Sequence, residues 1–301
     1  MTPSPRPPAA VRTGIATPTE LLEVFSWLDR DPVVNVYLVA LLLRDRLAAP
    51  ADEYWLARRD EEIVGLVHVG SASGAVLPAS GTAEAHAALA ERVAERLLRL
   101  PPRFHVVGDR DGVTAIRDRL RRSGLEPSRF RDHTYMALAA GDLPDFERVP
   151  GLRPTRPEDR ALVHDSGADL RAEEMGDDPR HSDPTGYARR VEEECGGGYT
   201  WLWIEGGELR FRASLSALSA DAVQIAGVYT PPAQRGRGYA RRGLAELCAR
   251  QFARVSAACL FVGDDNAPAR AVYRRLGFRE RAAWGSAFYA RGEPTGDGLS
   301  T

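Results

Sequence analysis

The chain has 301 residues, of which 44% are hydrophobic and 27% are charged, and its formal net charge is −2 with a sequence pI near 6.3. This length accommodates about two domains, and the nearly balanced charge argues against a dedicated nucleic-acid binder or a polybasic membrane protein. Apart from histidine, every basic residue is arginine, so no lysine is available as a Schiff-base or catalytic group.

The cysteines and histidines give no sign of a disulfide framework or a metal site. Cys195, Cys248 and Cys259 are odd in number and lack a CxxC spacing, and the six histidines show no ligand spacing. The N-terminus, MTPSPRPPAA, has no apolar core of a signal peptide, and no later run is long enough to cross a membrane. We therefore expect a cytoplasmic protein with no metal and no membrane partner.

The first half of the chain alternates helical and strand patterns. Residues 1–17 are rich in Pro, Ala and Thr and are predicted to be a flexible leader. The apolar periodicities that follow predict helices at 21–28, just after 32, 83–100 and 113–122, and strands at 53–59, 63–69, 74–78, 104–107 and 133–138. A first domain is thus expected at 18–140.

The second half repeats this order after a Pro-containing linker predicted at 141–150. The patterns predict strands at 152–154, 199–205, 208–215, 223–229, 258–262 and 284–290, and helices at 158–174, 187–194, 240–255 and 266–276, with a loop at 175–185. A second domain is expected at 151–291, followed by a flexible tail at 292–301. Two halves of similar order indicate an internal duplication.

The segment Gln234 to Ala240, QRGRGYA, follows a predicted strand and precedes a predicted helix. Gly236 and Gly238 allow the backbone to approach an anion closely. The first N–H groups of a helix and its dipole favour negative charge, and arginine forks match phosphate oxygens. The segment is therefore a candidate pyrophosphate loop, although a surface loop with chance arginines would read the same way.

A second segment follows about 25 residues later: DNAPA at 265–269, then YRRLGF at 273–278. Together the two segments resemble the acetyl-CoA-binding core of the GNAT N-acyltransferases over roughly residues 152–290. The first half resembles a degenerate copy without the glycine loop, as in tandem-GNAT proteins of an actinobacterial type. The resemblance implies an α/β fold of two GNAT-like domains, each a mixed, mostly antiparallel sheet flanked by helices.

The resemblance also implies roles for individual residues. The strand before the loop would splay at a bulge, where main-chain groups pair with pantetheine and Val228 serves as an oxyanion site. Asn266 would bond the pantetheine arm, or cap the following helix. Tyr273 would protonate the leaving thiolate, or merely pack in the core. The residues implied to contact acetyl-CoA are Gly227, Val228, Tyr229, Gln234, Arg235, Gly236, Arg237, Gly238, Tyr239, Ala240, Asn266 and Tyr273.

The general base is not evident from the sequence. Many members of the family carry a glutamate on the strand before the bulge, yet residues 222–229 contain none. Glu173, Glu174 and His181 lie in the region that usually walls the acceptor pocket, and among them we select Glu174. A base is also dispensable if the acceptor site desolvates the amine.

We therefore expect an enzyme that transfers acetyl from acetyl-CoA directly to an amine of a small molecule or peptide, with the first domain shaping the acceptor pocket or a homodimer. Mycothiol-synthase-like transfer, aminoacyl-tRNA-dependent transfer and a non-catalytic CoA-sensing or scaffold role remain alternatives. The arginines of 117–122, with Arg129 and Arg131, form a basic cluster that would meet RNA or lie as a solvated helix face.

Overall fold

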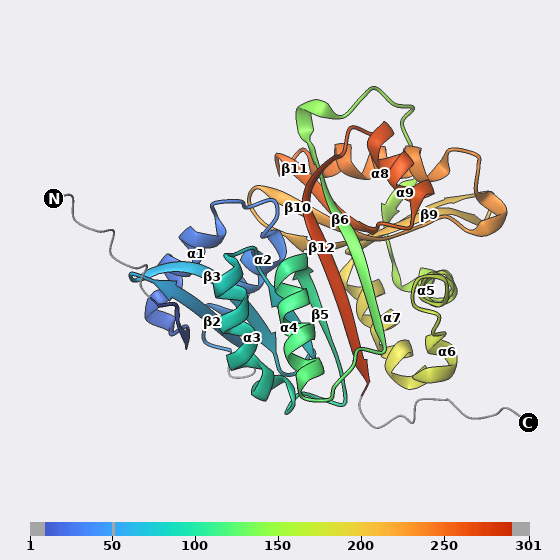
Figure 1. Cartoon of the computed structure of the whole chain (residues 1–301). Coiled ribbons are helices and arrows are strands. Elements are labelled where there is room, and N and C mark those ends of the chain that lie inside the picture. The colour runs from blue at the N-terminus through green and yellow to red at the C-terminus, as the bar shows by residue number, and fades with distance from the viewer. Residues whose placement is uncertain (1–9, 50–51, 291–301) are drawn as a thin grey trace, which may run out of the picture. The chain divides into compact units, whose positions relative to one another are not determined.

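The computed structural model describes residues 10–49 and 52–290, and within them the chain forms two compact units (Figure 1). Of the described residues, unit 1 contains those up to Asp31, those within Leu38–Thr134, and residues 282–290. Unit 2 contains Pro32–Tyr37 and Tyr135–Arg281.

Unit 1 is built on a mixed sheet in the order β1-β2-β3-β4-β5-β12. The pair β4–β5 is parallel and the other neighbours are antiparallel. Its strands are β1 (Arg12–Ile15), β2 (Asp52–Arg59), β3 (Glu62–Gly70), β4 (Ala75–Pro78), β5 (Arg103–Asp109) and β12 (Arg279–Ala290), and its helices are α1 (Leu21–Leu28), α2 (Val36–Asp45), α3 (Ala83–Leu97) and α4 (Arg110–Arg122), with a 3-10 turn η1 (Pro18–Glu20).

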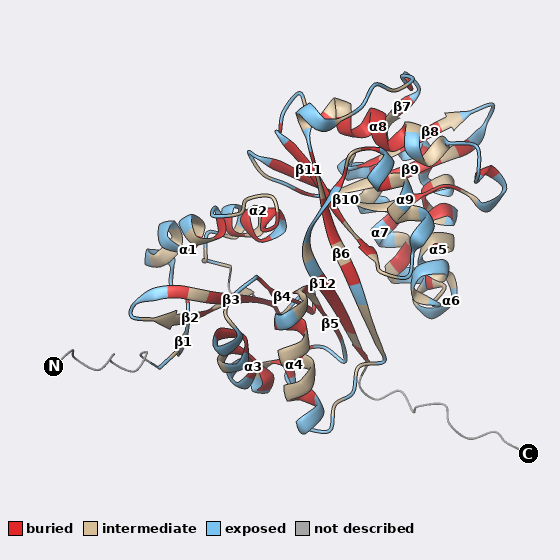
Figure 2. Cartoon of the chain, turned by 45° about the horizontal axis from the view of Figure 1, so that its top comes forward, coloured by how far each residue is buried: buried red, intermediate tan, exposed pale blue. Residues whose placement is uncertain are grey.

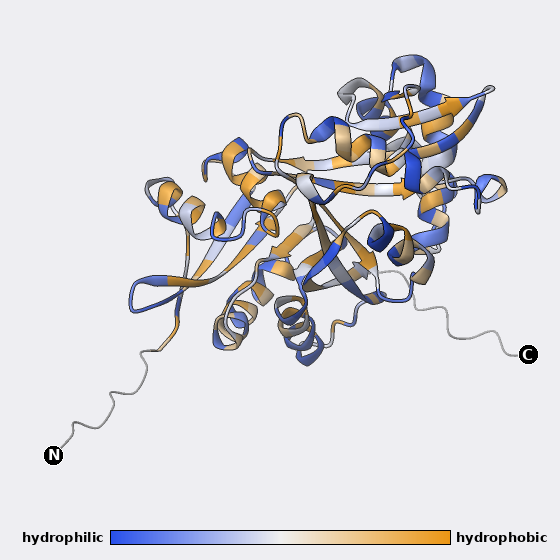
Figure 3. Cartoon of the chain, turned by 90° about the horizontal axis from the view of Figure 1, so that it is seen from above, coloured by the Kyte–Doolittle hydropathy of each residue, from blue (hydrophilic) through white to orange (hydrophobic). Residues whose placement is uncertain are grey.

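Helices cover both faces of the unit 1 sheet. Helices α3 and α4 lie side by side, and each turns a buried face toward the strands and an exposed face outward (Figure 2). Their apolar residues form one core with β2 to β5 and the end of β12, whereas α1 and α2 form a second core around Tyr54 and Leu66. In the hydropathy colouring, apolar residues lie along the strands and also on the helices (Figure 3).

Unit 2 repeats this architecture with the sheet order β7-β8-β9-β10-β11-β6. The pair β10–β11 is parallel, while β7, β8, β9 and β10 pair antiparallel in succession. Its strands are β6 (Arg129–Ala139), β7 (Leu152–Pro154), β8 (Thr200–Glu205), β9 (Glu208–Leu218), β10 (Ala222–Tyr229) and β11 (Ala257–Gly263), and its helices are α5 (Arg160–Met175), α6 (Pro179–Ser182), α7 (Pro184–Gly197), α8 (Tyr239–Gln251) and α9 (Ala267–Arg275), with 3-10 turns η2 (Ala140–Asp142), η3 (Pro157–Asp159) and η4 (Pro232–Gln234).

The two units match strand for strand, but each takes its sixth strand from the other half of the chain. Residues 282–290 of β12, the last strand, belong to unit 1, where they pair with β5 from Trp284↔Asp109 to Ala290↔Arg103. Residues 135–139 of β6 belong to unit 2, beside β11. The compact units therefore differ from the predicted domains at 18–140 and 151–291, because a strand is exchanged at the end of each half.

The predicted fold class is confirmed, and most elements lie where the periodicities placed them. The predicted leader is wrong over residues 12–15, which form β1 and pair with β2; residues 1–9 and the tail at 292–301 lie outside the described residues. The predicted loop at 175–185 contains the short helix α6 and the start of α7.

The predicted linker at 141–150 packs onto unit 2. Val149 is buried, and its N–H donates to the fully buried carboxylate of Glu246 on α8 at 3.0 Å. Arg148 and Arg250 also donate to Glu246, and together these contacts lower its pKa to about 2. None of the helices in the described ranges has the length and apolar character needed to cross a bilayer.

Candidate functional site

Strands β10 and β11 separate soon after they meet. Their parallel pairing covers Ala222↔Ala257, Val223↔Ala258 and Gln224↔Cys259. On the other side of β10, the register with β9 shifts between Ala226 and Tyr229. Gly227 and Val228 therefore fall between paired positions, opposite a single residue of β9, and form the β-bulge that we predicted at this point.

Gly227 is the residue that bends the strand. Its φ of +60° lies in the left-handed region. A Cβ at this position would lie 3.6 Å from Cδ2 of Leu170 and 3.7 Å from Oγ of Ser214, so α5 packs close to the bulge. The main-chain groups of Gly227 and Val228 are thus turned out of the ladder at the point where β10 and β11 part.

The chain after β10 forms the predicted glycine loop and enters α8. Gly236 and Gly238 have φ values of +77° and +79°, and added Cβ atoms there would meet no atom within 4 Å. Gly238 is the N-cap of α8, and no side chain caps the helix. The N–H groups of Gln234 and Arg235 already donate to Pro231 and Pro232, so N–H groups for an anion must come from Gly236 onward.

The arginines of the loop differ in their contacts. Arg237 and Arg241 are exposed, and within the described part of the chain neither forms an ion pair. Arg235, in contrast, donates from Nη2 to both carboxylate oxygens of Glu173 at 2.8 and 2.7 Å and from Nε to the Thr230 carbonyl at 3.0 Å. The loop and the first turn of α8 therefore present two arginines without an ion pair among the described residues, Arg237 and Arg241, and one arginine, Arg235, that is paired with Glu173.

Gln234 and Tyr239 fix the ends of the loop. The Gln234 side chain is buried and donates to Glu208 at 2.9 Å. The Tyr239 ring lies edge-on to Trp203, with 5.0 Å between centroids, and under the guanidinium of Arg210 at 5.3 Å. These side chains position the loop from β8 and β9. Ala240, which follows, is half-buried in the first turn of α8.

Asn266 caps α9. Its Oδ1 accepts the N–H of Ala269 at 3.1 Å, so the helix-capping role considered from the sequence is confirmed. At the other end of α9, Gly277 has a φ of +91° and the Phe278 N–H donates to the Tyr273 carbonyl, so the helix ends in a left-handed cap.

Tyr273 is buried in the unit 2 core, with 7% of its surface exposed, and its ring contacts Phe278. Burial first, and the negative charge of Glu174 second, raise the pKa of the phenol above its ordinary value. The hydroxyl therefore stays protonated at neutral pH.

The three candidate bases lie in different surroundings. Glu174 is exposed at the end of α5 and is near enough for its charge to act on Tyr273. Glu173 is held by Arg235. The side chain of His181 is 85% exposed and lies 3.5 Å from Asp178, so nothing joins it to the bulge or to α9.

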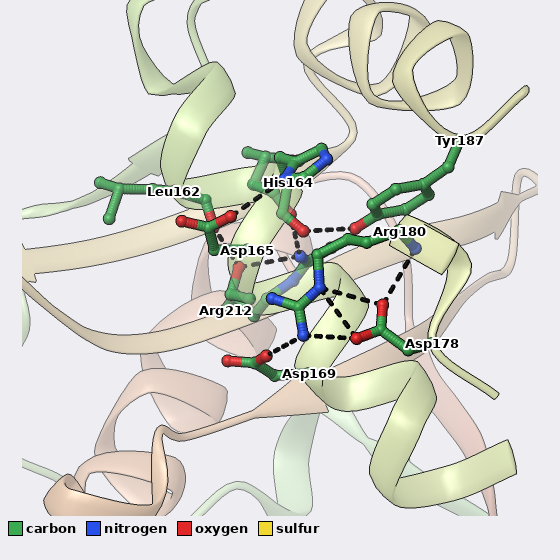
Figure 4. A network of polar contacts seen from close by, with 10 residues as sticks. Leu162, His164, Asp165, Asp169, Asp178, Arg180, Tyr187 and Arg212 are labelled. Carbon is green, nitrogen blue, oxygen red and sulfur yellow. Dashed lines mark hydrogen bonds and ion pairs between the residues drawn. The ribbon is translucent and has the colours of Figure 1, made fainter. Parts of the chain in front are cut away.

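A network of polar contacts among α5, α6, α7 and β9 was not predicted from the sequence (Figure 4). Arg212, buried on β9, donates to the Val163 carbonyl, to Ser166 and to Glu194. Arg180 bridges Asp169 and Asp178, and the Tyr187 hydroxyl donates to the His164 carbonyl. The sequence did not indicate that Arg212 is buried, because the chain has many arginines, no lysine, and no regular spacing that sets Arg212 apart.

The basic cluster of unit 1 is largely neutralised within the unit. Arg119 and Arg122 pair with Glu91, Arg117 pairs with Asp118, and Arg121 pairs with Glu126. These ion pairs agree with the alternative of a solvated helix face on α4. In the described ranges, no three His, Cys, Asp or Glu side chains gather in a way that would hold a metal ion.

Comparisons with known proteins agree with this geometry. The sequence model of the acetyltransferase (GNAT) family matches residues 168–278, which include the bulge, the loop and α9. No curated protein sequence matches the chain.

Solved structures share the fold over most of the chain. A Drosophila protein is 14% identical with a TM-score of 0.62, covering 93% of this chain and 99% of its own. A GCN5-related N-acetyltransferase from Sphaerobacter thermophilus is 18% identical with a TM-score of 0.54, covering 93% and 96%. A GNAT-family acetyltransferase from Colwellia psychrerythraea is 10% identical with a TM-score of 0.54, covering 93% and 99%. Residues 168–278 thus match the acetyltransferase (GNAT) family, and the solved structures show that the chain shares its fold with proteins of that family.

Proposed function

We propose that unit 2 binds acetyl-CoA and transfers its acetyl group directly to an amine of a small molecule or peptide. The observation that carries the proposal is the junction of β10 with α8, where diverging strands, a bulge and a glycine-capped helix start occur together. A pyrophosphate fits this junction because Gly236 and Gly238 leave open space, and Arg237 and Arg241 have no counter-charge among the described residues.

The bulge would hold the acyl donor and activate it. Main-chain groups at Gly227, Val228 and Tyr229 would pair with pantetheine in place of the interrupted β9 ladder. In the transition state, the Val228 N–H would donate to the acyl oxygen as that oxygen gains negative charge. Asn266, whose Oδ1 already caps α9, would donate from its amide NH₂ to the pantetheine arm.

Tyr273 would act on the leaving group. Because its raised pKa keeps the hydroxyl protonated, Tyr273 can donate to the thiolate that departs when the amine attacks. Transfer from a phenol to a thiolate is uphill in water, where the two pKa values are about 10 and 8.5. Burial raises the pKa of the phenol and of a thiol alike, so the transfer depends on a hydroxyl placed directly beside the departing sulfur.

Glu174 would receive the proton that the amine loses, directly or through water. Its charge acts on the Tyr273 phenol, which supports the pairing of a base on α5 with an acid on α9. Unit 1 would bind no CoA, and its part would be to shape the acceptor pocket or a dimer.

The test is release of free thiol from acetyl-CoA in the presence of a panel of amines. Tyr273→Phe should lower turnover by about 10² to 10⁴ with little change in the CoA dissociation constant. Tyr199→Phe, an exposed tyrosine of the same unit, is the matched control. Tight CoA binding without turnover on any amine would favour the CoA-sensing alternative, which the absence of a carboxylate on β10 already motivates. If CoA does not bind at all, the proposal fails.

A further inference from the structure

The contact between Arg235 and Glu173 joins the candidate pyrophosphate loop to α5. Arg235 Nη2 lies 2.8 and 2.7 Å from the two oxygens of the Glu173 carboxylate, and its Nε bonds the Thr230 carbonyl. Its guanidinium also lies 5.7 Å from the centre of the Tyr229 ring. A carboxylate thus sits on a cation of the loop that would have to hold the donor's phosphates.

This ion pair is accessible and inexpensive to break. The side chains of Arg235 and Glu173 are 49% and 42% exposed, and an exposed pair of this kind contributes about 0.2–1 kcal/mol. A pyrophosphate offers the same guanidinium more charge and more acceptor oxygens than one carboxylate. The donor can therefore displace Glu173 from Arg235 without disturbing the fold.

The release of Glu173 would change the surroundings of the acceptor. Glu173 lies one helical turn after Asp169 on α5, and the charges of both carboxylates raise the pKa of the buried Tyr229 phenol at the end of β10, after burial as the main cause. Asp169 is itself held by Arg180. A carboxylate freed from Arg235 would thus lie next to the bulge, where the amine must arrive as an ammonium ion before it is deprotonated.

We propose that Glu173 occupies Arg235 in the donor-free protein as a substitute for a donor phosphate, and that donor binding transfers Arg235 to the phosphate and frees Glu173 to position the ammonium of the acceptor. The inference rests on the proposed function, because it requires a donor with phosphates at this loop. It assigns a positioning role to Glu173 that is separate from the roles of Tyr273 and Glu174.

The experiment measures the dissociation constant of CoA, and of inorganic pyrophosphate as a minimal probe, for the full-length protein. Glu173→Gln should tighten binding by about two- to fivefold, which is the worth of an exposed ion pair, and the gain should shrink in 0.5 M salt. Glu192→Gln removes one charge from an exposed ion pair on α7, away from the loop, and should leave both constants unchanged.

A double-mutant cycle separates competition from a general charge effect. In an Arg235→Gln background, Glu173→Gln should have no effect on CoA affinity, since the two side chains act through one contact. Equal or weaker CoA binding by Glu173→Gln, or the same gain in both backgrounds, would overturn the inference while leaving CoA binding by the wild type intact. Failure of the wild type to bind CoA would instead overturn the proposed function.

Discussion

Each unit contains a strand, a connecting segment and a helix in the same order: β4 and α3 in unit 1, and β10 and α8 in unit 2. The two connecting segments differ in how they cap the helix that follows. In unit 2 the helix α8 starts at Gly238 without a side-chain cap. In unit 1 the helix α3 starts after Thr82, whose side chain accepts the N–H of Ala85 at 3.2 Å. The free N–H groups that would attract an anion to α8 are therefore partly used at α3.

The two units also differ in how closely their parallel strands approach each other, β10 and β11 in unit 2 and β4 and β5 in unit 1. In unit 2 the register of β10 breaks at a bulge, and Gly227 is turned toward Leu170 and Ser214 without crowding. In unit 1 a Cβ on Gly108 of β5 would lie only 2.2 Å from the Pro78 carbonyl oxygen at the end of β4. The backbones of β4 and β5 are thus in close contact where a donor would have to enter. We therefore expect the capping threonine and the closed end of β4 and β5 to keep CoA out of unit 1.

The largest expected effect is the loss of stability of unit 1 when the chain is shortened so that β12 is absent. A chain that ends at Phe278 lacks β12, and with it the pairing to β5, the Tyr289 ring stacked on Phe104, and Ala287 of the core. We expect such a chain to lose the cooperative unfolding of unit 1, measured by hydrogen exchange in β5. A chain that ends at Ala290 keeps the strand and is the control; equal protection of β5 in both chains would contradict the prediction.

Glycine substitutions at the two connections should have opposite consequences. Gly238→Ala forces a left-handed residue with a φ of +79°, costing about 1–2 kcal/mol, and should weaken CoA binding by about tenfold or more because the backbone can no longer approach a phosphate. Gly108→Ala should cost unit 1 about 2–3 kcal/mol through overpacking and leave the affinity for CoA unchanged. Thermal unfolding and CoA titration of both variants test this, and weakened CoA binding by Gly108→Ala would show that the two connections are coupled.

Acid should weaken unit 1 before unit 2. Burial lowers the pKa of His68 from 6.5 to about 4, and a carboxylate oxygen of Asp52 lies 3.9 Å from its Nε2. Because the folded pKa lies below the unfolded value, the stability of unit 1 is unaffected above pH 6.5 and falls as the pH drops from 6.5 to 4, by about 3 kcal/mol in total.

In unit 2, the pKa of Glu246 is lowered from 4.5 to about 2, so its contribution is complete above pH 4.5 and is lost only as the pH falls through 2. Hydrogen exchange in β3 and β9 between pH 6.5 and 4.5 reads the units separately. A His68→Gln variant should abolish the slope in β3, and an unchanged slope in that variant would rule out His68 as its source.

The smallest effect concerns the caps. Thr82→Ala should destabilise unit 1 by about 1 kcal/mol, since it removes the side-chain cap of α3, and Asn266→Ala should cost unit 2 a similar amount. Only the second change should also weaken CoA binding. The pair of variants, compared by denaturant unfolding and CoA titration, separates a cap that is structural alone from one with a second task; equal CoA affinity in both would limit Asn266 to capping.

The helices and strands could be predicted because their apolar residues repeat at helical or strand spacing, as in α3 and β10. The glycine loop could be predicted because its glycines, its arginines and the start of the next helix are adjacent in the sequence, so that their anion-binding character is visible without the fold. Strand β1 was missed, since RTGI is short and follows a Pro-rich segment. Helix α6 was missed because four residues show no periodicity.

Other features depend on which distant residues meet. The residues near Arg235 do not predict its ion pair with Glu173, 62 positions earlier. The residues near Pro78 do not predict the close approach of Gly108 to the Pro78 carbonyl. The exchange of sixth strands is also not encoded locally, because β6 and β12 have the composition of ordinary buried strands and either sheet would accept them. Such pairings follow from tertiary packing, which a periodicity cannot report.

The position of β12 has a consequence for synthesis in the cell. Its partner in unit 1, β5, leaves the ribosome about 180 residues earlier, which at about 5–20 residues per second is a delay of roughly 9 to 36 seconds. During that interval the nascent chain carries a sheet with an open edge at β5, a feature that invites pairing with other chains. Unit 1 can complete its sheet only after β12 has been translated.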